Sequence, residues 1–321
     1  MKLWRKAAIG LALLAVGLSL LNASWIAPRP AGRLVVIAQR GIVQPLREDA
    51  DGGGCTARSI RASEDNLYIE NSLPSLFKAT RLGAEGVEID VRRSRDGHAI
   101  VFRDESVECR TNGRGRVADL GLAELKALDI GHGYTPDGTS FPLRGRGIGG
   151  MPTVEETLRE IPEAHIVFNL RGGGPALADA LVAAFRRAEV KIDRRYGFHG
   201  DAAALARLKS LVPDAWTFEV GRLGACLDAY VPVGWTGYVP EACRRTSVGV
   251  PVGTGWTVWG WPYRFFARMA GAESRVLMYR GIAGGEILGL DAPEQLDRVP
   301  RDFKGHLFIE DFHTVGRALQ R

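Results

Sequence analysis

Two carboxylates stand close together in an apolar stretch of the chain and could bind a metal ion. Glu88 and Asp90 are two residues apart, so in a strand both side chains point to the same face. Two convergent carboxylates suit a hard divalent cation, and Asn169, in a second apolar stretch, could add an amide oxygen. The pattern predicts calcium or magnesium at these three residues. The alternative is a solvated pair, because Glu-x-Asp is a short and common pattern.

Two arginines come directly after apolar stretches of the same kind as those that hold Glu88, Asp90 and Asn169. Arg40 comes directly after one apolar run, and Arg171 directly after the run that holds Asn169. A cation together with guanidinium groups forms a phosphate pocket, because the planar fork of arginine matches phosphate oxygens. The arginines therefore favour a phosphate-binding site over a solvated pair.

The elements that must position these residues follow from the pattern after residue 33. Apolar β-branched runs alternate with amphipathic segments, which predicts parallel strands joined by crossover helices. Strands are expected at 34–39, 86–92, 99–103, 165–170, 195–199, 215–220, part of 249–258, 275–279 and 306–309, and helices at 73–82, 122–128, 154–161, 176–188 and 202–212. Glycine-rich 51–54, 145–150 and 171–174 are expected loops. The fold class is α/β, a TIM (β/α)8 barrel over residues 31–321, whose site would lie at the carboxyl ends of the strands.

Several segments occur in order at characteristic spacing: Gln39-Arg40-Gly41, Glu70-Asn71-Ser72-Leu73-Pro74, Gly83 to Val91, Asp96-Gly97, Ile100 to Asp104, Cys109 to Gly115, Met151 to Glu156 and Trp259-Gly260-Trp261-Pro262. Taken together, they resemble the glycerophosphodiester phosphodiesterase family, which consists of calcium- or magnesium-dependent α/β barrels. The resemblance covers roughly residues 33–172 and, more loosely, the rest.

The resemblance implies roles for individual residues. Glu88 and Asp90 would bind the metal and Arg40 the phosphate, with Glu70 and Asp104 as supporting residues. Asn169 stands where many relatives have a third acidic ligand, and Arg171 where they have a phosphate-contacting lysine. The implied ligand is a small glycerophosphodiester, and the implied activity is metal-dependent hydrolysis in lipid headgroup metabolism.

The chain departs from this family at the two positions that matter most for proton transfer. The family has histidines, acting as general acid and base, where this chain has Gln39 and Arg103. An amide does not titrate and a guanidinium stays charged, and each lost proton transfer is expected to cost ~10²- to 10⁴-fold in rate. Two functions remain open: a phosphodiesterase, and a pseudoenzyme that binds a phosphate or phosphodiester without turnover.

One histidine could replace the missing ones. His199 ends the predicted strand 195–199 and should reach the barrel mouth, whereas His98, His165 and His306 precede or open strands and should lie at the opposite face. The hypothesis is that His199 supplies an acid or base. The alternative is a histidine that is merely hydrogen-bonded at a strand end.

The N-terminus predicts a membrane or export segment over residues 1–30. Lys2, Arg5 and Lys6 precede an apolar stretch at 7–27, which as a helix would span ~31 Å, close to the bilayer core. A signal anchor and a cleaved signal peptide are both possible. The anchor is favoured because Leu21 precedes Ala23 where a cleavage site would have a small residue. The barrel would be exported, to the periplasm or another extracytoplasmic space, with membrane contact through this helix only, or secreted if the segment is cleaved.

Four cysteines lack zinc-site spacing, and export makes disulfides plausible. Of three pairings, Cys55 with Cys109 and Cys226 with Cys243 is favoured because each pair shares a region of the chain; four buried thiols are the alternative.

The charge pattern argues against a nucleic-acid partner. Of 42 Lys and Arg residues, four lie in the first 30 positions, which leaves 38 against 37 acidic residues.

Two further segments are interpreted by their composition. The long 41–69 segment is expected to form a lid or specificity loop over the mouth. Trp256, Trp259, Trp261, Phe265 and Phe266 are expected to pack in the core, with a choline-like ligand as the alternative.

Overall fold

The computed structural model describes residues 2–29, 32–47, 55–61, 63 and 65–319. The chain divides into two compact units. The larger unit comprises Val36–Glu219, Gly289–Pro293 and Ile309–Arg321, and the smaller one comprises Met1–Val35, Val220–Leu288 and Glu294–Phe308. The expected loop at 51–54 lies outside the described residues.

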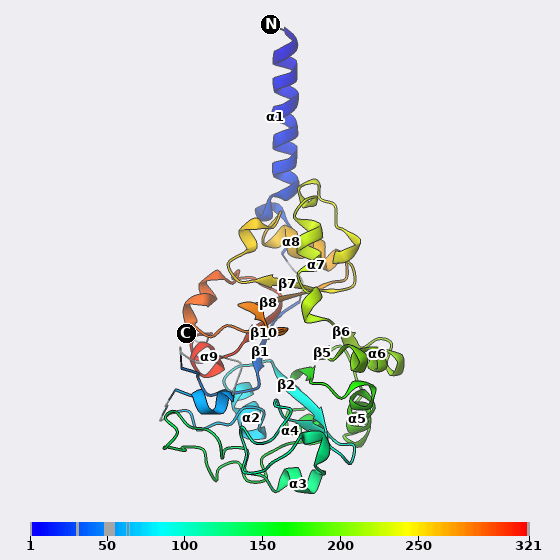
Figure 1. Ribbon diagram of the computed structural model, residues 1–321. Coiled ribbons are helices and arrows are strands. Elements are labelled where there is room, and N and C mark those ends of the chain that lie inside the picture. Colours follow the sequence, from blue (N-terminus) through cyan, green and yellow to red (C-terminus); the bar gives the residue numbers. More distant parts are fainter. Residues whose placement is uncertain (1, 30–31, 48–54, 62, 64, 320–321) are drawn as a thin grey trace. The chain divides into compact units, whose positions relative to one another are not determined.

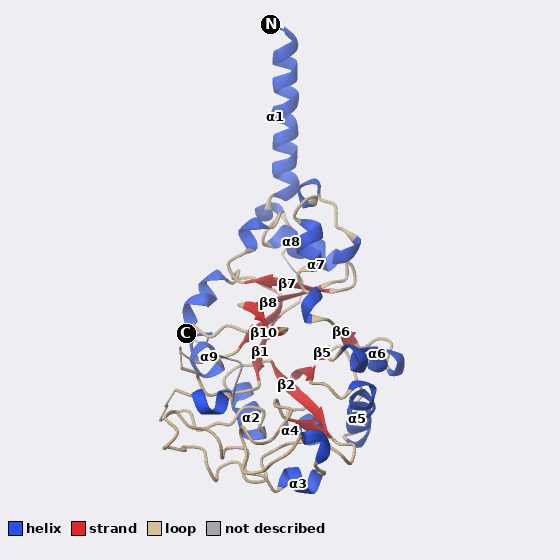
Figure 2. Ribbon diagram, in the orientation of Figure 1, coloured by secondary structure: helices blue, strands red, loops and turns tan. Residues whose placement is uncertain are grey.

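The larger unit is built on parallel strands. β1 (Leu34–Gln39), β2 (Gly86–Arg93), β4 (His165–Leu170), β5 (Tyr196–Gly200) and β6 (Trp216–Thr217) pair in the order β1-β2-β4-β5-β6. The first three are buried along nearly their whole length, as expected for parallel strands covered on both faces. Figure 2 shows these strands with helices beside them.

Helices in this unit begin where the sequence supplies caps. They are α2 (Leu73–Arg81), α3 (Leu122–Lys126), α4 (Val154–Glu160), α5 (Gly174–Arg187), α6 (Ala202–Leu211) and α9 (Phe312–Leu319). The Ser72 side chain accepts the Ser75 N–H at the start of α2, Thr153 and Glu156 form a capping box at α4, and Asp201 caps α6. These caps fix helix starts directly after strands or loops that carry polar residues.

The expected third barrel strand at 99–103 is wrong. β3 covers only Ala99–Val101 and pairs antiparallel with β2, with Val91 opposite Val101. The link between them is a tight turn in which the Ser94 N–H donates to the His98 carbonyl and Gly97 has a φ of 85°. A parallel partner would need a crossover of a dozen or more residues, so this short link allows only a hairpin. Arg103 therefore follows a hairpin strand.

The smaller unit contains parallel strands of its own. β7 (Ser247–Pro251), β8 (Arg275–Tyr279) and β11 (Gly305–Ile309) pair in that order, and β9 (Gly281–Ala283) and β10 (Glu286–Leu288) form a small antiparallel ribbon. The helices α7 (Ala225–Tyr230) and α8 (Tyr263–Gly271) also belong to this unit.

The N-terminal segment forms the long helix α1 (Lys2–Asn22), seen in Figure 1 as the extended blue helix. Trp4–Asn22 is long and apolar enough to cross a membrane, and it is not covered by the rest of the described chain. The helix ends five residues earlier than the apolar stretch, and Ser24–Ile26 form a short 3-10 turn, η1.

Both predicted disulfides are confirmed. Cys55 is bonded to Cys109 and Cys226 to Cys243. The first pair ties part of the 41–69 segment, including the turn Thr56–Ser59, to the loop that follows β3. Residues 48–54, 62 and 64 of that segment lie outside the described residues, so its role as a lid stays a prediction.

The expected core position of the aromatic cluster is only partly correct. Phe265 and Phe266 are buried on α8, but the Trp256 and Trp259 side chains are 85% and 43% exposed. The expectation failed for these two because they lie in turns beside α8 rather than on its buried face.

Candidate active site

The site begins where β1 and β2 run side by side. Gln39 is the register partner of Glu88, so both side chains leave the same face of the sheet. The Gln39 amide nitrogen donates to Glu88 Oε2 at 2.7 Å, and its amide oxygen accepts the Gly289 N–H at 2.6 Å. The Gln39 amide is thus fixed as a hydrogen-bond donor to a carboxylate, and an amide does not exchange protons as an acid or base.

The second carboxylate is held by a row of donors from neighbouring strands. Asp90 is in register with Asn169, and Asn169 with His199. Asp90 Oδ1 accepts the Asn169 amide at 3.0 Å and lies 3.2 Å from the Arg171 guanidinium, while Oδ2 accepts the Asn71 amide at 2.9 Å. Asp90 is buried, so these donors offset the cost of removing its charge from water.

His199 reaches the site, as expected from its place at the end of a strand. Its Nε2 lies 3.1 Å from Glu88 Oε1, and because a carboxylate only accepts, the imidazole N–H donates. The ring is buried and stacks on Phe218 at 5.0 Å between centroids. A histidine held this way has a fixed orientation relative to Glu88.

Arg40 is fixed between acidic groups and has unusual backbone geometry. Its guanidinium lies 3.1 Å from Glu310 Oε1 and 3.6 Å from Glu70 Oε2. Arg40 and Asn71 both adopt left-handed backbone, with φ values of 59° and 58°, and the Asn71 N–H donates to the Arg40 carbonyl. Such strain costs about 1–3 kcal/mol per residue and concentrates at functional sites.

Arg103 differs from the other arginines of the site. Among the described residues, its guanidinium has no hydrogen bond or ion pair, although the side chain is partly buried. The charge of Arg40, followed by burial, lowers the pKa of Arg103. A guanidinium in this position is stabilised by an added anion.

Arg92 positions two of these arginines through their backbones. Its side chain donates to the Arg103 carbonyl at 2.9 Å and to the Arg171 carbonyl at 2.8 Å. The loop after β3 and the end of β4 are therefore held together by one side chain.

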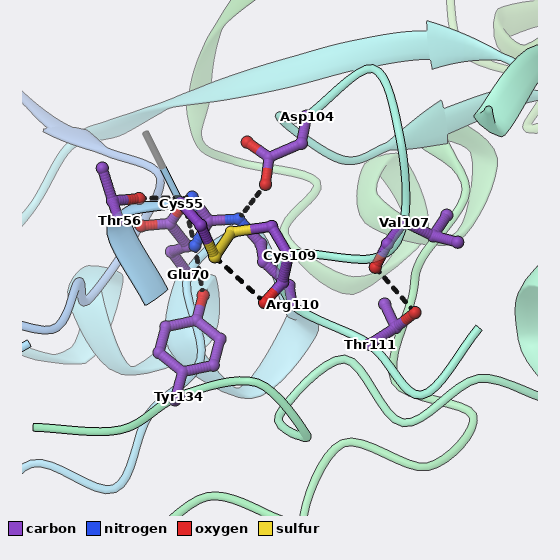
Figure 3. Close-up of a disulfide and its surroundings, with 9 residues drawn as sticks. All are labelled: Cys55, Thr56, Glu70, Asp104, Val107, Cys109, Arg110, Thr111 and Tyr134. Carbon is purple, nitrogen blue, oxygen red and sulfur yellow. Dashed lines mark hydrogen bonds and ion pairs between the residues drawn. A yellow bond between two sulfur atoms is a disulfide. The ribbon is translucent and has the colours of Figure 1, made fainter. Parts of the chain in front are cut away.

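A buried ion-pair cluster supports this arrangement, as Figure 3 shows. The Arg110 guanidinium binds Asp104 Oδ2 at 2.8 Å, Tyr134 Oη at 2.7 Å and Thr56 Oγ1 at 2.8 Å, and it lies 3.3 Å from Glu70 Oε1. Arg110 directly follows Cys109, and Thr56 directly follows Cys55, so the disulfide brings the donor and one acceptor together. Glu70 and Asp104 thus both contact Arg110, and their supporting role stays a prediction.

Glu70 gives this cluster a pH dependence. Burial alone would raise the pKa of Glu70, but the guanidinium charges of Arg110 and Arg40 lower it to about 2 from its ordinary 4.5. The folded-state pKa lies below the unfolded value, so the ionised carboxylate stabilises the fold fully above pH 4.5, and this contribution is lost as the pH falls toward 2.

We therefore expect the Glu70→Gln variant to unfold at lower denaturant concentration than the wild type at pH 7, with the difference shrinking between pH 4.5 and 2. Denaturant titrations followed by circular dichroism across that range measure it. A difference that is the same at pH 7 and pH 2 would contradict the account.

The residues fit a divalent cation through two carboxylates. The hydrogen bonds described above use one lone pair on each of Glu88 Oε1, Glu88 Oε2 and Asp90 Oδ2, which leaves each of these oxygens a second one. Magnesium is commonly bound by one or two carboxylates together with substrate phosphate and water. In the part of the chain that the structure describes, no three His, Cys, Asp or Glu side chains cluster as a closed metal site. Asn169 turns its amide nitrogen, rather than its oxygen, to Asp90.

Three residues of the site were missed from sequence. Asn71 binds Asp90 through both its side-chain nitrogen and its oxygen, which accepts the Asp90 N–H at 3.2 Å. Arg110 and Arg92 organise the arginines and their acidic partners. Asn71 and Arg110 both lie inside segments that carry the family resemblance, and that was the available signal.

Comparison with known proteins finds similarity to one family over part of the chain. Residues 61–173 match the model of the glycerophosphoryl diester phosphodiesterase family. A glycerophosphodiester phosphodiesterase from Caldanaerobacter subterraneus is 47% identical over 62 residues, covering 19% of this chain and 26% of that protein. The human glycerophosphodiester phosphodiesterase 1 is 35% identical over 116 residues, covering 35% of this chain and 33% of that protein. The chain therefore spans about a third or less of the length of these curated relatives.

Solved structures resemble a much larger part of the chain. A glycerophosphodiester phosphodiesterase from Agrobacterium tumefaciens has a TM-score of 0.59 at 17% identity, covering 89% of this chain and 99% of that one. A phosphodiesterase from Oleispira antarctica, in complex with the product sn-glycerol-3-phosphate, has a TM-score of 0.54 at 19% identity, covering 93% and 100%. These likenesses confirm the α/β-barrel fold class. The family model and the curated relatives show similarity to the glycerophosphodiester phosphodiesterase family over about a third of the chain or less.

Proposed function

We propose that this protein binds a glycerophosphodiester at the Arg40–Arg103–Arg171 cluster and hydrolyses it slowly with the help of a divalent cation. The observation that carries the proposal is the Arg103 guanidinium, which is partly buried beside Arg40 and has no acidic partner among the described residues. Arginine is well suited to phosphate because its planar fork matches two phosphate oxygens. A phosphodiester anion would supply the missing partner.

The proposed roles follow from the contacts. Arg40 and Arg171 would orient the phosphate from positions fixed by Glu310 and Asp90, and Arg103 would complete the clamp. Glu88 and Asp90 would hold magnesium or calcium, with Asn169 as a further ligand once its amide oxygen turned inward. The cation would neutralise charge on the phosphate and favour attack at phosphorus. Glu70 and Asp104 would not contact the substrate; Glu70 would position Arg40, and Asp104 would position Arg110.

His199 is the residue proposed for proton transfer. Hydrolysis needs one proton removed from the attacking hydroxyl and one given to the departing alkoxide, and neither Gln39 nor Arg103 can exchange a proton near neutral pH. His199 is a titratable side chain in contact with Glu88 in this buried site. Its Nδ1 would exchange the proton while the Nε2–H donates to Glu88 and keeps the ring oriented.

A second function is binding of the same ligand without turnover. It is favoured by the fixed amide of Gln39 between Glu88 and Gly289, which places a non-titrating group beside the carboxylate. Arg103 adds a positive charge that favours holding an anion over releasing a product. Both functions share the arginine pocket and differ in turnover.

Hydrolysis of glycerophosphocholine and glycerophosphoethanolamine by the full chain, with magnesium or calcium, tests the first function. We expect turnover above a Glu88→Gln blank that is lost on chelation, because the carboxylate charge is needed to hold the cation. The His199→Asn variant is expected to lose a further ~10²-fold or more, since Asn keeps a donor to Glu88 but cannot titrate. Binding without turnover in the wild type would establish the second function, and unchanged turnover in His199→Asn would exclude the role of His199.

Export and anchoring are part of the proposal. Trp4–Asn22 has the length and composition of a membrane span, and basic residues at its start favour a cytoplasmic N-terminus. Two disulfides are typical of an oxidising compartment. We therefore place the barrel outside the cytoplasm.

A further inference from the structure

Exposed aromatic side chains gather around the end of α1 in the smaller unit. Trp25 is 78% exposed, Tyr238 58%, Trp259 43% and Trp235 41%, and Ile26 next to Trp25 is 46% exposed. We call these five residues the aromatic face. Tryptophan and tyrosine are enriched where a protein meets the headgroup region of a bilayer, because their rings are apolar and carry one polar group.

Hydrogen bonds tie the aromatic face to the helix end. The Asn22 side chain donates to the Trp235 carbonyl at 2.7 Å, and Ser24 Oγ accepts the Tyr263 N–H at 2.8 Å. The Trp259 indole donates to the Val231 carbonyl at 2.9 Å, which holds that ring beside the segment leading to Trp235. Figure 1 shows α1 reaching this unit beside α8.

Arg268 makes this connection a rigid joint. Its guanidinium donates to the Leu21 carbonyl at 3.1 Å, to Asn22 Oδ1 at 3.1 Å and to the Gly234 carbonyl at 3.0 Å, so one side chain on α8 joins the last turn of α1 to the turn that carries Trp235. Gly237 is also close to the helix, since a side chain there would lie 3.3 Å from Leu21. The end of α1 is therefore packed and hydrogen-bonded against the smaller unit.

We propose that the aromatic face rests in the headgroup region of the membrane that α1 crosses, so that the smaller unit is seated on the lipid surface. This inference rests on the membrane-spanning role proposed for α1. Trp25 is three residues past the end of the span at Asn22, so the chain between them reaches at most about 11 Å. The interface follows directly after the span, so the bilayer is the partner whose position matches these side chains.

Hydroxyl-radical footprinting of the wild-type full chain, reconstituted at low density in phosphatidylcholine–phosphatidylglycerol vesicles, tests the proposal without any substitution. Flotation of the vesicles is measured in parallel. We expect the chain to float with the vesicles and Trp235 and Tyr238 to be oxidised at least about fivefold more slowly than their exposure implies. Phe77 on α2, which is 45% exposed and belongs to the other unit, is the control and should react at the rate its exposure implies.

The outcomes distinguish the claim that α1 anchors the chain from the claim that the aromatic face rests on lipid. If the chain floats but Trp235 and Tyr238 react as freely as Phe77, the seated arrangement is wrong while the anchor stands. A chain that does not float contradicts both the anchor and the seating. Protection that is lost on further dilution of the protein in the vesicles would assign the face to a second copy of the chain instead of lipid. An Arg268→Gln variant that still floats should lose part of the protection, because the joint is weakened.

Discussion

The double substitution Gln39→His, Arg103→His is expected to raise the rate of glycerophosphodiester hydrolysis by at least about 10²-fold. Each general acid or base typically contributes ~10²- to 10⁴-fold. Both positions lie at the site: Gln39 donates a hydrogen bond to Glu88, and Arg103 is near enough to Arg40 that the charge of Arg40 lowers the pKa of Arg103. Part of the gain is offset because the second substitution removes a phosphate-binding charge. Steady-state kinetics should therefore show a higher kcat together with a higher KM.

The matched control is Gln39→Asn, Arg103→Asn, which makes similar changes in size without adding a titratable group. Its turnover is expected to stay at or below that of the wild type. If the histidine and asparagine pairs behave alike, proton transfer is not what limits this site, and the account of the two departures from the family is wrong.

Replacing Arg110 is expected to have the largest effect on stability. Arg110→Met removes one partner from a buried cluster: it takes from Glu70 the nearer of its two cationic partners and leaves the Tyr134 hydroxyl without its donor. Breaking a buried pair in this way costs about 3–5 kcal/mol, because an uncompensated charge remains. Denaturant unfolding of the larger unit should show a clearly lower midpoint.

Arg116→Met provides the comparison on the surface. Arg116 also pairs with an acidic residue, Glu105, but both side chains are 62% exposed. Exposed pairs contribute at most about 1 kcal/mol, so this variant should unfold close to the wild type. Equal losses in the two variants would show that burial and the network around Glu70 do not determine the stability of this region.

The parts of the fold that were predictable are those set by local pattern. Continuous apolar runs located β1, β4 and β8 to the residue, because buried parallel strands need apolar side chains on both faces. β3 was assigned the wrong partner because composition alone does not distinguish a hairpin strand from a barrel strand; the short link to β2 does.

The site was predictable where spacing within one strand decides the geometry, as for Glu88 and Asp90. The end of β5 likewise placed His199. The network between segments was not predictable: Asn71 lies 19 residues from Asp90, and Arg110 meets Thr56 across a disulfide-linked loop. Such contacts depend on tertiary packing that no periodicity encodes.

The most direct test of the central claim, that the arginine cluster holds a phosphodiester, is calorimetric titration of glycerophosphoethanolamine into the full chain. Arg103→Gln is expected to weaken binding about 10- to 150-fold, the usual worth of one charge-assisted hydrogen bond. Arg114→Gln, at an exposed arginine of the same unit, should bind as the wild type does. Binding by the wild type that is unchanged in Arg103→Gln, or no binding by the wild type with magnesium or calcium present, would contradict the account.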